Sequence, residues 1–204
     1  MTAMLLDIKG TNITFTTALA VFCATPQKLG YYYTPEGGAI ARGVNAGLLK
    51  LNADSVDFFP DNTGGIYYEF GNGQAASTTW ELTGLSPFTS FTTMVSRGFP
   101  AMATPNFLPD SASLNGGLQL QWSNNYSNAD SIFVFVGDGN STPLHRHLPG
   151  NANSVTFMPA EMAKLSAGRG EINMQASNYS NETVNGKNYL YIQQRLLSSS
   201  LILY

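Results

Sequence analysis

The sequence has few charged residues. Asp, Glu, Lys and Arg make up 11% of the 204 residues, against about 25% in an average soluble protein. The formal net charge is −3, whereas proteins that bind DNA or RNA usually present a strongly basic face. We therefore expect no nucleic-acid partner.

The sequence also lacks a long hydrophobic run and a second cysteine. No window approaches the roughly 18 apolar residues that a membrane helix needs, so we expect no transmembrane segment in this sequence. The single cysteine, Cys23, excludes a disulfide within the chain. Its apolar surroundings predict a small buried side chain on a strand. A lipid-bearing cysteine and a catalytic thiol are the alternatives, and bulky Phe22 disfavours the first.

Uncharged polar residues and aromatic residues take the place of charge. Aromatics are 12% and hydrophobics 43% of the chain, which is enough for a core and unlike a disordered segment. The surface residues are mainly Asn, Ser, Thr, Gly and Gln. A surface so poor in Lys and Glu favours an exported protein, secreted or held at the cell surface. Residues 1–9 do not have the charged-then-apolar order of a signal peptide.

Short segments with strand character fill the chain, separated by turns rich in Gly, Pro and Asn. In the first half, the expected strands are 12–17, 29–34, 39–44, 48–51, 64–71, 78–83 and 89–95. In the second half, they are 118–122, 130–136, 143–148, 154–157, 170–176, 188–192 and 196–204. A helix is expected only at 159–165, where Pro159 suits a helix start.

Residues 98–117 are expected to connect two units. Pro100, Pro105 and Pro109 lie in this stretch, and no strong periodicity runs through it. Proline keeps such a connection extended and semi-rigid. The sequence therefore predicts an all-β protein of two antiparallel β-sandwich modules, residues 1–104 and residues 105–204. Turn signals every 8–12 residues are typical of such sandwiches.

The second half resembles the fibronectin type III and immunoglobulin-like sandwich superfamily. Residues 109–111 lead to Leu-Gln-Leu-Gln-Trp at 118–122, which resembles the early strand with its core tryptophan, and 129–134 resembles the strand that follows. Residues 155–165 resemble the crossover into the sixth strand. Residues 171–174 and 186–189 resemble the last hairpin, with Gly186 at its turn. The resemblance implies a module of the kind frequent in exported bacterial surface proteins and lipoproteins. It carries over no functional residues.

Tyrosines in polar surroundings are the candidate ligand-binding residues: Tyr31, Tyr33, Tyr67 and Tyr126. A tyrosine has an apolar ring and a polar tip. An exposed ring can therefore stack on a sugar while neighbouring amides bond the sugar hydroxyls. The alternative is that alternate tyrosines face the core and the others cover the opposite face of their strands.

Two further groups of side chains are candidates for metal binding or catalysis. His145 and His147 would lie on one face of a strand and could hold Zn²⁺ or Cu²⁺ with further ligands, but Arg146 between them disfavours a cation. The densest acidic group contains Asp54, Asp57, Asp61 and Glu69. A glycoside hydrolase needs two carboxylates about 5–10 Å apart across a cleft, and loop oxygens can also bind calcium. We expect turn chemistry at Asp61, with no catalytic residue, metal or cofactor.

The sequence therefore predicts a non-catalytic exported protein. It would act in surface attachment, as a protein-binding or spacer module, with a cell-surface protein or polysaccharide as its partner. One alternative is a carbohydrate-binding module that uses the exposed tyrosines. A second alternative is a glycan hydrolase.

Overall fold

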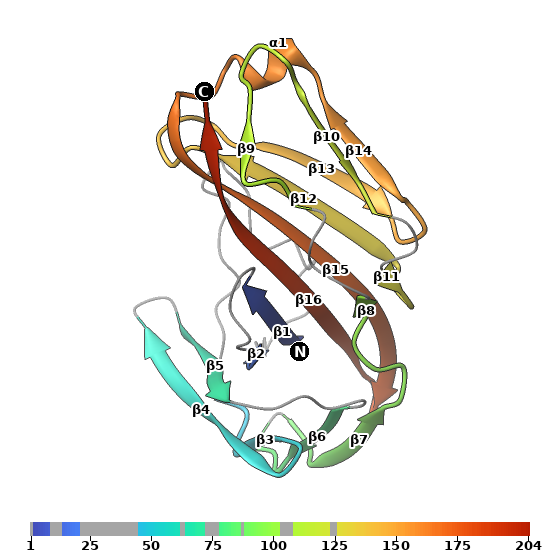
Figure 1. Cartoon of the computed structure of the whole chain (residues 1–204). Helices are drawn as coiled ribbons and strands as arrows, with labels where there is room; N and C mark the ends of the chain where they lie inside the picture. The colour runs from blue at the N-terminus through green and yellow to red at the C-terminus, as the bar shows by residue number, and fades with distance from the viewer. Residues whose placement is uncertain are drawn as a thin grey trace.

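The computed structural model describes residues 2–8, 14–20, 45–61, 64–71, 78–86, 88–102, 108–122 and 126–204. Within these ranges the chain is nearly all β-structure (Figure 1), which confirms the predicted class. The strands are β1 (Thr2–Ile8), β2 (Thr14–Ala20), β3 (Leu49–Leu51), β4 (Asp54–Asp61), β5 (Gly64–Gly71), β6 (Thr78–Leu82), β7 (Phe91–Val95), β8 (Ala101–Met102), β9 (Ser111–Ala112), β10 (Leu118–Gln121), β11 (Tyr126–Ser127), β12 (Ser131–Gly137), β13 (Leu144–Pro149), β14 (Ser154–Phe157), β15 (Gly168–Val184) and β16 (Lys187–Leu203). The helix α1 (Pro159–Met162) starts at the expected proline but is shorter than expected.

Most strands belong to one twelve-stranded sheet. Its order is β13-β12-β15-β16-β1-β2-β5-β4-β3-β6-β7, with β9 also paired to β16. The pairs β10–β14 and β8–β11 form two further small sheets. Strands β1 and β9 both pair with β16 in parallel, so the expectation of purely antiparallel sheets was wrong for these pairs. Both reach β16 by long connections, which parallel pairing requires, and not through a tight hairpin.

The hairpin of β15 and β16 is the longest feature of the fold. Its register runs from Gly168 opposite Leu203 to Val184 opposite Lys187. The turn residues Asn185 and Gly186 have φ angles of +51° and +74°, as a two-residue hairpin turn requires. Gly186 thus lies at the turn of the last hairpin as expected. The sequence had indicated separate short strands here, because the polar run 177–183 reads as a loop.

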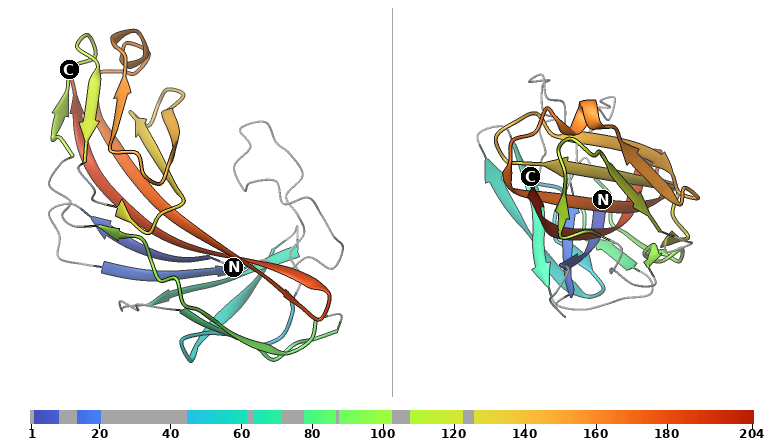
Figure 2. Two further views of the ribbon diagram at one scale, coloured as in Figure 1. Left: turned by 90° about the vertical axis from the view of Figure 1, so that its right-hand side faces the viewer. Right: turned by 45° about the horizontal axis from the view of Figure 1, so that its top comes forward.

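Two buried cores lie toward opposite ends of this hairpin (Figures 1 and 2). The upper core, near α1, lies between the β10–β14 pair and the sheet formed by β12, β15 and β16. Its largest side chains are Trp122, 1% exposed, and Phe157, 0% exposed. Aliphatic residues fill the rest, namely Leu108, Leu118, Leu120, Ile132, Val134, Val136, Val155, Met162, Leu165, Ile172, Met174, Leu197, Leu201 and Leu203.

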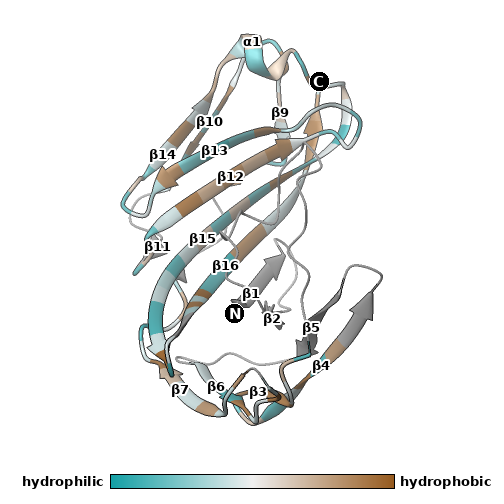
Figure 3. Cartoon of the chain, turned by 180° about the vertical axis from the view of Figure 1, so that it is seen from behind, coloured by the Kyte–Doolittle hydropathy of each residue, from teal (hydrophilic) through white to brown (hydrophobic). Residues whose placement is uncertain are grey.

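The lower core lies around β3, β6 and β7 and is more aromatic. Trp80 is 1% exposed at its centre. Tyr189 and Tyr191 of β16 join it, and the Phe91 and Tyr189 ring centroids are 4.7 Å apart. The same two strands, β15 and β16, therefore contribute to both cores. In the upper core, buried residues alternate with more exposed ones at 171–176 of β15 and 197–203 of β16, whereas the lower part of β15 is mostly hydrophilic (Figure 3).

Some local details differ from the expectations. Asp61, where turn chemistry was expected, is the last residue of β4 and faces Gly64, the first residue of β5. The connection 98–117 contains the short strands β8 and β9. The division between residues 104 and 105 stays a prediction. Cys23 and the expected strands 29–34 and 39–44 lie outside the described residues.

Candidate functional site

One face of the upper part of the large sheet carries aromatic and amide side chains. Ile132, Val134 and Val136 of β12 are buried in the upper core. Because side chains alternate along a strand, the residues between them point to the other face. In register with them are residues of β13 and β15. We call the following set the outer face: Phe133, Phe135, His145, His147, Asn173 and Gln175.

The outer face carries no charge when the imidazoles of His145 and His147 are neutral. It is partly open to solvent. Phe133 is 37% exposed, and His145 and His147 are also exposed. The Phe133 and His145 rings are stacked, with centroids 5.8 Å apart and planes 21° apart. Gln175 lies directly opposite Phe133 across the β12–β15 ladder. An apolar ring thus stands next to hydrogen-bonding side chains on a sheet surface.

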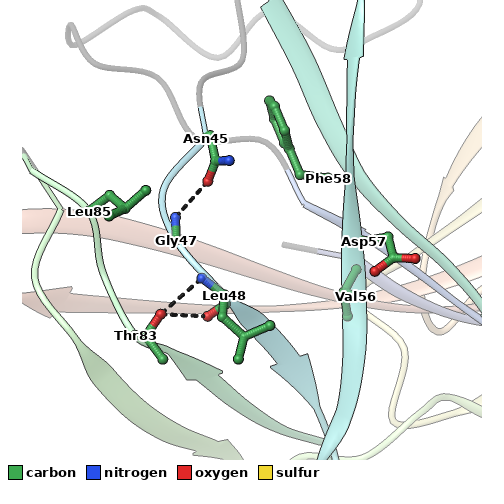
Figure 4. A pocket seen from close by; sticks show the side chains of 8 residues that line it. All are labelled: Asn45, Gly47, Leu48, Val56, Asp57, Phe58, Thr83 and Leu85. Atoms are coloured by element: carbon green, nitrogen blue, oxygen red, sulfur yellow. Dashed lines mark hydrogen bonds between the residues drawn. The ribbon is translucent and has the colours of Figure 1, made fainter.

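A second feature is an open depression of about 360 Å³ beside β3 and β4 (Figure 4). Thr83 Oγ1 accepts the Leu48 backbone N–H at 2.9 Å, and Asn45 Oδ1 accepts the Gly47 N–H at 2.9 Å. Leu48 and Leu85 are 47% and 53% exposed. The described lining residues are Asn45, Gly47, Leu48, Val56, Asp57, Phe58, Thr83 and Leu85.

Asp57 is the one carboxylate among these lining residues. Hydrolysis of a glycoside by the usual mechanism needs a pair of carboxylates. The described lining of the depression therefore offers a single carboxylate beside Leu48, Phe58 and Leu85.

The predicted tyrosines are not brought together in the described part of the chain. Tyr31 and Tyr33 lie outside the described residues. The backbone of Tyr67 belongs to β5, opposite Phe58 of β4. The backbone of Tyr126 belongs to β11, opposite Met102 of β8 and in a different sheet. Their binding role stays a prediction.

The candidate histidines lie on β13, and the candidate residues Asp54 and Asp57 lie on β4. His145 and His147 share the exposed side of β13 as expected, while Arg146 points the other way. The Arg146 Nη2 atom lies 2.5 Å from Glu161 Oε1, and the guanidinium lies over the Phe157 ring. Asp54 and Asp57 are exposed on β4. Within the described residues, no group of three His, Cys, Asp or Glu side chains is placed to hold a metal ion.

A charged clamp joins the segment after β7 to the start of β12. Arg97 Nη1 and Nη2 lie 2.5 and 2.7 Å from the two carboxylate oxygens of Asp130. Arg97 Nε also donates to Asn128 Oδ1 at 3.0 Å, and Asp130 accepts the Tyr179 N–H at 2.8 Å. The hydrogen bonds from Arg97 are the main reason that the pKa of Asp130 is lowered. The clamp fixes the lower part of the molecule against the upper part.

A second aspartate organises the top of the upper core. Asp138 accepts the backbone N–H groups of Ser141, Asn140 and Ser166, at 2.7, 2.9 and 2.6 Å. These bonds, the one from Ser141 first, hold the pKa of Asp138 far below its ordinary value. The carboxylate therefore holds the β12–β13 turn to the segment after α1 through these hydrogen bonds. Its role is structural.

Sequence reasoning missed the outer face and the clamp. Residues 132–136 are all apolar, so the sequence could not tell which of them face the core and which form the outer face. Arg97 and Asp130 lie on segments far apart in the sequence, and no local pattern pairs them.

Comparison with protein-family models gives no match, and comparison with curated protein sequences gives none either. None of the helices in the described ranges has the length and hydropathy to cross a bilayer.

Proposed function

We propose that this chain is a non-catalytic β-sandwich protein that is exported and acts at the cell surface as a rigid binding or spacer module. The single observation that carries the proposal is the β15–β16 hairpin, which supplies side chains to both buried cores. A module that holds a partner at a fixed distance must resist bending between its ends. Two long, fully paired strands passing through both cores give that resistance.

Additional contacts between the hairpin and the lower strands support this proposal. Glu182 accepts the Thr93 hydroxyl at 2.6 Å, and Asn185 Nδ2 donates to Thr89 Oγ1 at 2.7 Å. The Arg97–Asp130 clamp adds a contact nearer the middle of the molecule. In the second half, the packing of β10 and β14 against the large sheet supports the sandwich reading. The surface poor in charge supports export.

Rigidity can be measured by the distance between two spin labels. Met94 on β7 and Met158 before α1 are 65% and 59% exposed and lie near opposite ends of the molecule (Figure 1). We expect the labelled variant Cys23→Ser/Met94→Cys/Met158→Cys to give one narrow distance distribution. A broad or two-peaked distribution would contradict a rigid module. A label pair within the upper part, at positions 139 and 158, is the matched control.

The location is tested on cells of the natural source. We expect protease added to intact cells to degrade the chain, as judged with an antibody against it. A control protein of the cytoplasm should be protected. If the chain is degraded only after lysis, export is wrong.

A second candidate function, carbohydrate binding, is favoured by the outer face. An exposed aromatic ring can stack on the C–H face of a sugar, and the Gln175 amide and the imidazoles can exchange hydrogen bonds with its hydroxyl groups. The central part of this face lacks a permanent charge, which suits a neutral glycan. The binding surface of this second candidate function would be at Phe133 and His145, whereas the sequence had favoured tyrosines.

Calorimetric titration with a panel of neutral oligosaccharides tests this second function. We expect Phe133→Ala to weaken binding about fivefold, since a lost ring contact is worth about 1 kcal/mol. Met94→Ala, an exposed apolar residue far from the outer face, is the control and should bind normally. If Tyr67→Ala or Tyr126→Ala weakens binding and Phe133→Ala does not, the tyrosines form the site. Absence of any binding would leave the first function alone.

A further inference from the structure

Two fully buried amide side chains face each other between the two cores. Asn178 of β15 and Gln193 of β16 are directly opposite in the hairpin register. They are 0% and 1% exposed. Directly opposite residues of an antiparallel pair point to the same side of the sheet and are its closest side-chain neighbours. The two amide groups are therefore buried neighbours on the same side of the sheet.

The amide nitrogens make one hydrogen bond each. Asn178 Nδ2 donates to the Gly98 carbonyl, and turning that amide over would lose the bond, because a carbonyl can only accept. Gln193 Nε2 donates to Thr78 Oγ1 at 3.1 Å. The two nitrogens thus hold β15 and β16 to the segment after β7 and to β6.

The two amide oxygens are left without a donor. Asn178 Oδ1 and Gln193 Oε1 are both buried and have no hydrogen-bond partner in the part of the chain that the structure describes. A buried acceptor that gives up water and gains nothing is strongly unfavourable, so native proteins usually satisfy such groups. Two such acceptors side by side call for one shared donor.

We infer that a single ordered water molecule is bound here and donates one hydrogen bond to Asn178 Oδ1 and one to Gln193 Oε1. A water molecule has two donors, which matches the two acceptors, and buried waters typically bond otherwise unsatisfied polar groups. A cation is the poorer match, because hard cations such as calcium take six to eight oxygen ligands, usually with carboxylates. Through the two amides, this water links β15 and β16 to Thr78 and Gly98, midway between the cores.

A crystal structure of the whole chain at about 1.2 Å resolution tests the site directly, because at that resolution hydrogens and amide orientations become accessible. We expect one density peak within hydrogen-bonding distance of both oxygens. Three results would overturn the inference. They are an empty space, a direct amide–amide bond between Asn178 and Gln193, and a peak that gains anomalous signal after rubidium replaces the crystal's monovalent cations.

Unfolding of variants tests the same site in solution. We expect Asn178→Leu and Gln193→Met each to lower Tm by several degrees, and the double variant to lower it by less than the sum, since both changes release the same water. Gln194→Met is the matched control. Its amide bonds Ser177 Oγ directly at 3.2 Å, and it should combine additively with Asn178→Leu. Full additivity of the Asn178 and Gln193 changes would overturn the shared site.

Discussion

The upper and lower cores share two strands but handle polar groups differently. In the lower core, Glu182 accepts hydrogen bonds from Thr93 and from the Tyr191 hydroxyl, the latter at 3.3 Å. Burial is the main reason that the pKa of Tyr191 is raised. In the upper core, polar groups stay at the rim, where Asp138 and the Arg146–Glu161 pair lie. The lower core therefore depends on side-chain hydrogen bonds from the hairpin tip, and the upper core depends on apolar packing.

The largest expected effect on stability tests whether the two cores unfold together or separately. Trp80 and Trp122 are each 1% exposed, and replacing a buried tryptophan with alanine costs about 3–5 kcal/mol. We expect Trp80→Ala and Trp122→Ala each to lower Tm while unfolding remains a single transition, because β15 and β16 pass through both cores. Differential scanning calorimetry measures this.

The conservative variants Trp80→Phe and Trp122→Phe serve as controls with smaller losses. A second transition that remains at the wild-type temperature would show that the cores unfold separately. That result would support the predicted division between residues 104 and 105.

The sequence predicts an element well where a local residue pattern determines it, and poorly where pairing with a distant strand does. Residues 154–157 alternate and lie between turn residues, and they form β14 as expected. The polar run 177–183 gave no strand signal, because its place in β15 is set by pairing with β16. The same holds for the sites. Phe133 lies in a continuous apolar run whose exposed side only the packing of β12 decides, and the buried pair Asn178 and Gln193 depends on the hairpin register and on contacts from β6.

An intermediate effect on stability is expected at the rim of the upper core, and it depends on pH. The lowered pKa of Asp138 means that its stabilising contribution is present above the ordinary aspartate pKa of 3.8 and is lost as the pH falls below it. We expect Asp138→Asn to lower Tm at pH 7 and to have a smaller effect at pH 3, where the wild-type carboxylate begins to lose its advantage. Asp54→Asn, at an exposed position of β4, is the control. An equal loss at both pH values would contradict the charge-based account.

The smallest effect concerns the clamp between the two parts. Arg97 and Asp130 side chains are 35% and 36% exposed, so solvent screens the pair and the loss for Arg97→Lys should be only about 0.5–1 kcal/mol. Lysine keeps the charge but cannot make the two parallel bonds. Urea unfolding at low salt and at 1 M NaCl measures it, and the loss should shrink at high salt.

The pair Lys50–Glu81 provides a control for the clamp. Its atoms are 3.9 Å apart on exposed side chains, and Lys50→Ala should change stability by about zero. If Lys50→Ala costs as much as Arg97→Lys, the clamp has no special role in holding the upper and lower parts together.

The parallel pairing of β1 with β16 has a consequence for the order of events during synthesis. Thr2 faces Ile192 and Ile8 faces Ser198, so β1 cannot take its place until nearly all of the sequence between them has been made. Contacts between residues so distant in sequence form slowly. The large sheet therefore closes late, and until β16 has been made β1 can pair only with β2.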